Sequence, residues 1–371
     1  MNDRRLLCKY LHRYSGATSR TPRLEPTDVP KTPVAQAIPG SSDSPERPQA
    51  PVSWYDPRGW SLRRRLIVAM AIVVVIVVVI VGTVEGVRAN RYPDYTPLNY
   101  RIVHTYDADS FFDNFDYFSA EDPTDGFVVY VDEVTAHDLN LTYTTNTSAI
   151  LRVDSFTPNA VGGRNSVRIE SKATYDSGLF VFDIVHTPYG CGTWPALWLT
   201  DGYNWPMNGE IDILESTNEA SQGNEVTLHT TEGCKMNVKR KETGSPVFKS
   251  CDNSTHGNAG CAVQGEPSTY GQAMNTNGGG VYALELRDAG IRVWFFPRDA
   301  IPDDLCDIGS HFRNQSIIVN IDLCGELASQ PMYYDDMYNC PATCPEFVAN
   351  NPTSFEEAYW EFGGFKVYQA V

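Results

Sequence analysis

The chain has 371 residues, 42% of them hydrophobic and 12% aromatic, which is enough for one large folded domain or two ordinary ones. Its net charge of -17 is unevenly placed: residues 1–65 carry 12 Lys and Arg against 6 Asp and Glu, and residues 85–371 carry 17 against 40. A region this acidic repels phosphate backbones, so the composition argues against a nucleic-acid partner.

The first 65 residues show no sustained hydrophobic period. Nine prolines lie in residues 1–60 among Ser, Thr, Asp and Arg, and apolar residues are few. A segment of this composition does not bury enough apolar surface to fold. We therefore expect residues 1–65 to form a disordered cytoplasmic tail, whose Ser and Pro content suits plain disorder as well as sorting or phosphorylation signals.

Residues 66–84 read LIVAMAIVVVIVVVIVGTV, 19 residues without a charge. A helix of this length reaches about 28 Å, which matches a hydrocarbon core. A buried strand needs fewer apolar residues, and a cleaved signal peptide would have a shorter apolar stretch nearer the N-terminus. Because Arg63, Arg64 and Arg65 precede the run, we expect a type II anchor with its N-terminus in the cytoplasm.

Four N-x-S/T sequons follow the apolar run and none precedes it. They begin at Asn140, Asn146, Asn253 and Asn314. Glycosylation at these positions requires a lumenal or extracellular C-terminal part. We therefore predict a glycosylated single-pass protein whose folded domain lies outside the cell or in the lumen of the secretory pathway.

The nine cysteines divide in the same way, with Cys8 alone before the run and eight after it. An even set of eight predicts disulfides and an oxidising compartment. Free buried thiols, or a zinc site around Cys340 and Cys344, are the alternatives. The eight are Cys191, Cys234, Cys251, Cys261, Cys306, Cys324, Cys340 and Cys344.

After a juxtamembrane linker at 85–99, residues 100–371 read as one folded unit of short strands separated by turns. Period-two runs occur at 166–170, 178–183 and 225–229, and a hairpin should pair 282–286 with 291–295 through a turn at 288–290. Many short strands without alternating helices predict an all-β sandwich. The curved face of such a sandwich suits a polymer.

Residues 210–215 form the acidic strand Glu-Ile-Asp-Ile-Leu-Glu. Alternation places Glu210 and Asp212 on one face of a strand, but Glu215 has the wrong parity. One extra residue in a β-bulge around Ile213 and Leu214 would return Glu215 to the face of the other two acids. The spacing therefore predicts a bulge inside this strand.

Three acids this close cannot all ionise freely, so one should hold its proton while another stays charged. An acid and a nucleophile in this arrangement are the pair that a retaining glycosidase uses, with Asp212 between them to hold the nucleophile. An acidic edge strand facing solvent, or oxygen ligands for calcium, is the alternative interpretation.

The acidic strand is preceded by Cys-Gly-Thr-Trp-Pro-Ala-Leu-Trp-Leu at 191–199 and Asn-Trp-Pro-Met-Asn-Gly at 204–209. This combination resembles glycoside hydrolase family 16, specifically fungal laminarinase-like endo-β-1,3(4)-glucanases. The likeness covers almost all of residues 100–371. It includes the segments 163–168, 227–230, 293–298 and 358–361.

The resemblance implies a concanavalin-like β-jelly roll without a metal or organic cofactor. By the same resemblance Glu210 matches the nucleophile, Asp212 the assisting acid and Glu215 the general acid/base. The residues expected to contact sugar are Trp198 and Trp205 on the donor side of the cleft, Trp194, His229 and Arg164. Core tryptophans, a structural histidine and a surface salt bridge are the alternatives for these five.

Two positions depart from the family pattern. Ser216-Thr217-Asn218 stands where many relatives have Gly-Val-Asn, and Leu327 stands where relatives often have tryptophan. The second could weaken a sugar subsite, which leaves the linkage open. The expected function is a retaining endo-β-glucanase acting on β-1,3 or mixed β-1,3/1,4-glucan of a cell wall; a wall transglycosylase and a non-catalytic glucan-binding protein are the alternatives.

Overall fold

The computed structural model describes residues 59–89, 96–237, 239–300 and 314–371. An N-terminal helix, α1 (Leu62–Ala89), contains a candidate membrane span, Leu62–Val87, with none of its most apolar stretch buried. The helix extends beyond the expected 66–84 at both ends, because arginine and glutamate continue a helix as readily as leucine. It therefore takes residues from both the expected tail and the expected linker; the rest of the tail, residues 1–58, lies outside the described residues.

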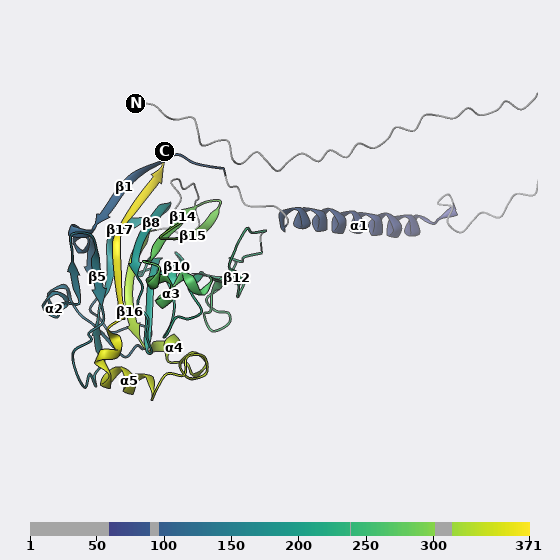
Figure 1. The fold of residues 1–371 in the computed structure, drawn as a ribbon. Helices are drawn as coiled ribbons and strands as arrows, with labels where there is room; N and C mark the ends of the chain where they lie inside the picture. The colour runs from purple at the N-terminus through teal and green to yellow at the C-terminus, as the bar shows by residue number, and fades with distance from the viewer. Residues whose placement is uncertain (1–58, 90–95, 238, 301–313) are drawn as a thin grey trace, which may run out of the picture. The chain divides into compact units, whose positions relative to one another are not determined.

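The folded domain is a sandwich of two twisted sheets (Figure 1). Sheet A has seven strands in the order β15-β14-β8-β17-β5-β4, with β1 added to β17. Its strands are β1 (Tyr100–Asp107), β4 (Thr142–Thr144), β5 (Ala149–Arg152), β8 (Gly178–His186), β14 (Gly280–Arg287), β15 (Gly290–Pro297) and β17 (Tyr359–Ala370).

Sheet B has eight strands in the order β12-β13-β11-β10-β9-β16-β7-β2, all paired antiparallel. They are β2 (Phe115–Tyr117), β7 (Arg168–Tyr175), β9 (Thr193–Thr200), β10 (Glu210–Glu215), β11 (Glu225–His229), β12 (Ser245–Pro246), β13 (Cys261–Gln264) and β16 (Gln315–Leu323). A separate parallel pair joins β3 (Val128–Tyr130) to β6 (Arg164–Ser166). The prediction of an all-β sandwich is confirmed.

Short helical segments connect the strands. The α-helices of the domain are α2 (Glu133–Asp138), α3 (Gly271–Thr276), α4 (Gly325–Ala328) and α5 (Cys344–Asn350). Single turns occur at η2 (Ala108–Ser110), η3 (Phe112–Asn114), η4 (Pro267–Thr269), η5 (Met332–Met337) and η6 (Pro352–Phe355). None of these segments exceeds seven residues, so the two sheets carry the fold.

Alternation along the strands places apolar side chains between the sheets and polar ones outside. In β16, for example, Ile317, Val319 and Ile321 are fully buried in the core, while Asn320 and Asp322 lie on the opposite face of sheet B, where they are also buried. The core also contains a cluster of aromatic rings. It includes Phe111, Phe182, Trp360, Phe362 and Phe365.

The expected hairpin forms with the register expected, since Tyr282 pairs with Phe295 and Leu286 with Ile291. The run expected at 166–170 is not one strand. Ser166 ends β6, where it pairs with Tyr130 of β3, whereas Arg168 begins β7 and pairs with Asn320 of β16. The chain changes partners at this point, which alternation within a single segment does not reveal.

Three disulfides join Cys191 to Cys340, Cys251 to Cys261, and Cys324 to Cys344. Disulfides are therefore confirmed for six of the eight cysteines. Cys340 and Cys344 each bond a different partner, which excludes the zinc site considered for them. Cys234 is free, and Cys8 and Cys306 lie outside the described residues.

All four sequons lie in the folded domain. Asn140, Asn146 and Asn314 are exposed and Asn253 is half-buried. Their exposure is compatible with the glycosylation expected from the sequence, which stays a prediction.

Replacement of Trp360 should destabilise the domain strongly. Its ring is fully buried, stacks on Phe362, and donates its Nε1 hydrogen to the carbonyl oxygen of Asn320 at 3.2 Å. Trp360→Ala should cost about 3–5 kcal/mol, a fall of roughly 10 °C in melting temperature. Tyr203→Ala, at a fully exposed ring, should melt close to wild type. Equal effects of the two changes would contradict this account of the core.

Candidate active site

The acidic strand β10 contains the bulge that its spacing predicts. Asp212 pairs with Trp198 of β9, but Leu214 pairs with Leu197, so Ile213 is the extra residue. Glu215 consequently pairs with Ala196. Because Ala196 and Trp198 lie two apart on β9, their partners Glu215 and Asp212 share one face of sheet B.

The other side chains of β10 explain why this bulge forms. Ile211, Ile213 and Leu214 are all fully buried in the core. Asn224 spans the irregularity, since its Nδ2 donates to the carbonyl of Ile213 at 2.8 Å and its Oδ1 accepts from the backbone N–H of Glu215 at 2.9 Å. The backbone groups freed by the extra residue are thus satisfied.

Glu210 is half-buried and meets the indole of Trp205, whose Nε1 donates to Oε2 at 2.6 Å. Burial and the charge of Asp212 raise the pKa of Glu210 above its ordinary value, although His229 and the Trp205 hydrogen bond oppose this rise. The indole ring of Trp205 is 39% exposed. Trp205 therefore both stabilises the charged form of Glu210 and presents a ring to solvent.

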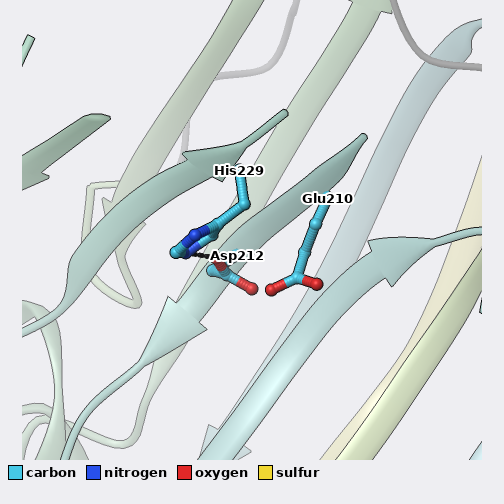
Figure 2. A group of neighbouring side chains, drawn as sticks. All are labelled: Glu210, Asp212 and His229. Atoms are coloured by element: carbon cyan, nitrogen blue, oxygen red, sulfur yellow. Dashed lines mark ion pairs between the residues drawn. The ribbon is translucent and has the colours of Figure 1, made fainter. Parts of the chain in front are cut away.

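Asp212 and His229 form a buried ion pair beside Glu210. Figure 2 shows the carboxylates of Asp212 and Glu210 turned towards each other, with the imidazole of His229 reaching Asp212 from the neighbouring strand β11. Nε2 of His229 lies 3.4 Å from Oδ2 of Asp212, and Nδ1 lies 3.0 Å from Oδ1 of Asn258. Burial alone would lower the pKa of His229, but Asp212, Glu210 and Glu215 raise it to about 10.

Glu215, at the other end of β10, is held in the same way as Glu210. Nε1 of Trp194 donates to its Oε1 at 2.8 Å. Burial and the charge of Asp212 raise the pKa of Glu215, which favours a protonated carboxyl near neutral pH. Each outer acid of the strand thus has its own tryptophan N–H, and Asp212 has the histidine.

Trp198 lies on the same face of the sheet as the acids but does not bond to them. Its Nε1 donates to Oδ1 of Asn320 at 2.9 Å, and Nδ2 of Asn320 donates to the hydroxyl of Tyr130 at 3.2 Å. The guanidinium of Arg168 lies 5.2 Å from the centre of the Trp198 ring. This group extends the polar face from β9 across β16 to β7.

The expectation that Arg164 contacts substrate is wrong. Its side chain is fully buried, and all three guanidinium nitrogens donate to backbone carbonyls. The carbonyl partners belong to Asp154, Thr157, Val348 and Ala349. Arg164 is a structural arginine; Arg168, four residues on, is the basic residue beside Trp198, and the change of strand partners after Ser166 hid this from the sequence.

Glu225 is a further acid that the sequence did not single out. It lies on β11, two and four residues before Thr227 and His229, which pair with Asp212 and Glu210. It therefore shares their face. Burial and Asp212 raise the pKa of Glu225, and its charge in turn raises the pKa of Glu215. Its parity relative to His229 was a signal available in the sequence.

The oxygens and nitrogen of Glu210, Asp212 and His229 also lie within 4.8 Å of one another, a spacing that a metal ion could use. The raised pKa of His229 means that a metal would have to displace its proton, because the protonated ring has no lone pair for a metal. The imidazolium instead balances the neighbouring carboxylates.

Residues 115–306 and 303–368 match the family described as "XgeA-like, catalytic GH16 domain". The chain is 40% identical over 298 residues to an endo-1,3(4)-β-glucanase of Arthroderma benhamiae, covering 73% of this chain and 65% of that protein. It spans less than half the length of several Aspergillus proteins described as probable endo-1,3(4)-β-glucanases.

Two solved structures share the fold. Laminarinase 16A from Phanerochaete chrysosporium, with two 6-O-glucosyl-laminaritriose β-glucans in its donor and acceptor sites, has a TM-score of 0.70 and 41% identity. An elongating family 16 β-1,3-glucosyltransferase has a TM-score of 0.68 and 37% identity. Each alignment covers 73% of this chain, with 99% and 100% of the respective structure.

The fold and the family match together define a jelly-roll glycoside hydrolase, which confirms the class of enzyme expected from the sequence. The chain belongs to glycoside hydrolase family 16.

His229→Gln should change how stability depends on pH. The folded pKa of about 10 exceeds the ordinary 6.5, so the histidine's contribution is complete below pH 6.5 and is lost as pH rises towards 10. The variant should melt below wild type at pH 6, and the gap should narrow by a few kcal/mol at pH 10. His256→Gln, at an exposed ring, is the matched control. A gap that stays constant with pH would contradict the ion pair.

Proposed function

We propose that the domain at 100–371 is a retaining endo-β-glucanase that hydrolyses β-1,3 or mixed β-1,3/1,4-glucan. The observation that carries the proposal is the bulge in β10, which brings Glu210, Asp212 and Glu215 to one face of sheet B. The similarity to fungal endo-1,3(4)-β-glucanases and to a glucan-bound laminarinase supports the substrate class.

In the first step Glu210 attacks the anomeric carbon and forms a glycosyl-enzyme ester. The bond to the leaving glycosidic oxygen breaks, and Glu215 gives its proton to that oxygen. The raised pKa of Glu215 suits this role, because the group must still hold a proton near neutral pH; the pKa of Glu210 is raised to a similar extent, so the two roles are assigned from the family resemblance. The Trp205 N–H favours the charged Glu210 that attack requires.

In the second step Glu215, now a carboxylate, takes a proton from water. The water oxygen attacks the anomeric carbon, and the ester bond to Glu210 breaks, which restores both groups. Two inversions at one carbon retain its configuration. Asp212 and His229 contribute a fixed pair of charges beside Glu210, so the nucleophile is oriented without the pair itself exchanging a proton.

The aromatic rings beside the acids suit a neutral polysaccharide. Trp205, partly exposed, and Trp198, half-buried, offer flat faces to the apolar sides of pyranose rings. Arg168 and Asn320 add polar groups next to Trp198. The half-buried Leu327 of α4 offers no such ring. The comparison of laminarin with mixed-linkage β-glucan described below tests the linkage preference.

Transglycosylation is the second candidate, because the glycosyl-enzyme can also be intercepted by a sugar hydroxyl. The similarity to an elongating family 16 β-1,3-glucosyltransferase favours its inclusion. Products longer than the substrate would indicate this reaction. A non-catalytic glucan-binding protein would bind without shortening or lengthening the chains.

Glu210→Gln and Glu215→Gln should each lower glucan hydrolysis by at least about 100-fold. The full chain in detergent would be incubated with laminarin and with mixed-linkage β-glucan, and reducing ends and product sizes followed. Glu346→Gln, at an exposed position of α5, is the matched control. Full activity in both active-site variants would contradict the assignment of Glu210 and Glu215 as catalytic residues. Products longer than the substrate in the wild type would show that the enzyme is a transglycosylase and not a hydrolase.

We also propose that α1 anchors the protein as a single-pass type II membrane protein. Its candidate span of 26 residues contains the uncharged run at 66–84, which is close to the roughly 20 residues that a hydrocarbon core requires, and none of its most apolar stretch is buried. Arg63, Arg64 and Arg65 begin the helix, which favours a cytoplasmic N-terminus. The C-terminal domain would then lie in the lumen or outside the cell.

Microsomes that contain the full chain should protect the C-terminal domain from protease and leave an epitope at the N-terminus accessible. Removal of N-glycans should increase gel mobility, and the variant with Gln at Asn140, Asn146, Asn253 and Asn314 should show no such change. An accessible C-terminal domain without glycans would contradict the orientation.

A further inference from the structure

The loop that carries Trp205 is held by something other than packing. It runs from Asp201 to Gly209 between β9 and β10, and its large side chains face solvent. Tyr203 is fully exposed, Met207 is 70% exposed and Trp205 is 39% exposed. Yet the indole of Trp205 lies at hydrogen-bond distance from Glu210. Apolar burial of these side chains is incomplete, so hydrogen bonds contribute to fixing that contact.

Asp201 supplies the missing constraint. Asp201 is only 3% exposed. Its Oδ2 accepts hydrogen bonds from three side-chain amides. The donors are Nδ2 of Asn204 at 2.8 Å, of Asn208 at 2.7 Å and of Asn314 at 3.2 Å. Oδ1 accepts from the backbone N–H of Tyr203 at 3.2 Å. One carboxylate thus joins the start, middle and end of the loop to the beginning of β16.

The surrounding sheet in turn fixes this polar hub, which consists of Asp201 and the side chains of Asn204, Asn208 and Asn314. Thr200 at the end of β9 donates its hydroxyl to the carbonyl of Gly209 at 3.0 Å. Gln315 of β16 donates its amide to the carbonyl of Asn208 at 2.9 Å. Since β9 pairs with β16 over eight residues and with β10 on its other side, these bonds fix the polar hub to the sheet that carries Glu210.

We propose that Asp201 is a positioning residue that keeps the Trp205 indole N–H on Glu210 and so helps set the ionisation of the nucleophile. The proposal rests on the proposed glucanase function for its kinetic consequence. Its structural part, the link from Asp201 through the loop to Trp205, stands on the hydrogen bonds alone.

The negative charge of Asp201 strengthens the hydrogen bonds that its carboxylate accepts. Burial would raise the pKa of Asp201, but the amide donors lower it overall, so it stays ionised across the working range. Asp201→Asn removes the charge and replaces one of the two acceptor oxygens by an NH2 group. Whichever way this amide is turned, its N–H groups face a donor that has lost its acceptor. The loop should loosen while the volume at position 201 is unchanged.

Glu210 should respond because few groups set its charge. Burial, and Asp212 and Glu215 on β10, raise its pKa, whereas His229 on β11 and the N–H of Trp205 lower it. Loss of the Trp205 hydrogen bond should therefore raise the pKa of Glu210. The acid limb of the kcat/KM profile should move to higher pH by about one unit.

Four versions of the full chain in detergent test this: wild type, Asp201→Asn, Trp205→Phe and the double variant. We expect both single variants to move the acid limb upward, and the double variant to move it no further than Trp205→Phe. Labelling with 15N-tryptophan gives a second readout, because the Trp205 indole resonance, identified by its loss in Trp205→Phe, should shift and exchange faster with solvent in Asp201→Asn.

Asp132→Asn is the matched control, since Asp132 also accepts a backbone N–H in a tight turn, at the start of α2, and asparagine caps helices equally well. Ser316→Ala separates the hub from glycosylation, because it destroys the Asn314 sequon but keeps the amide that donates to Asp201. Both controls should retain the wild-type acid limb and indole resonance.

An unchanged indole resonance and acid limb in Asp201→Asn would overturn the proposal, as would additive shifts in the double variant. If no version cuts or extends any glucan, the proposed function fails. The indole resonance still decides the role of Asp201 in that case, so the two failures are distinguishable.

Discussion

The extra residue at Ile213 is the constraint on which the active-site geometry depends. A regular strand would place Glu215 in the core and its apolar neighbour Leu214 on the face that carries Glu210 and Asp212. With the bulge, three acids share one face while Ile211, Ile213 and Leu214 stay buried. Asn224 satisfies the hydrogen bonds that the bulge would otherwise leave unmade, because its side-chain amide bonds to the two backbone groups at the irregularity. Core packing and site geometry are therefore set by the same residue insertion.

The electrostatic arrangement follows from that geometry. Four carboxylates, Glu210, Asp212, Glu215 and Glu225, meet on adjacent strands with one imidazole, that of His229. The negative charges raise the pKa of His229, and the charge of His229 lowers the pKa values of Glu210 and Glu215. Because the cluster is partly desolvated, it accommodates a limited number of negative charges, which explains why the outer acids bind protons more readily than free glutamate.

Sequence reasoning succeeded where a local rule determines the outcome. The parity of β10 required a bulge, and the hairpin of β14 and β15 follows from alternation around one turn. It failed where distant segments decide. Arg164 and Arg168 have the same parity, but the chain leaves the β3 partner for sheet B between them, so one is buried against α5 and the other lies beside Trp198. Disulfide pairing likewise depends on which loops the sheets bring together.

The two outer acids are supported by different means, although each receives one indole N–H. Trp194 lies within β9, where it pairs with Asp322 of β16 and its ring reaches Glu215. Trp205 lies on a solvent-facing loop, where no strand pairing acts and the amides around Asp201 take its place. In the proposed mechanism, the sheet thus positions the acid/base Glu215, whereas the polar hub at the edge of the sheet positions the tryptophan that bonds to the nucleophile Glu210. Since Trp205 is 39% exposed, a sugar ring that stacks on it, as proposed, would meet the loop while the indole N–H remains on Glu210.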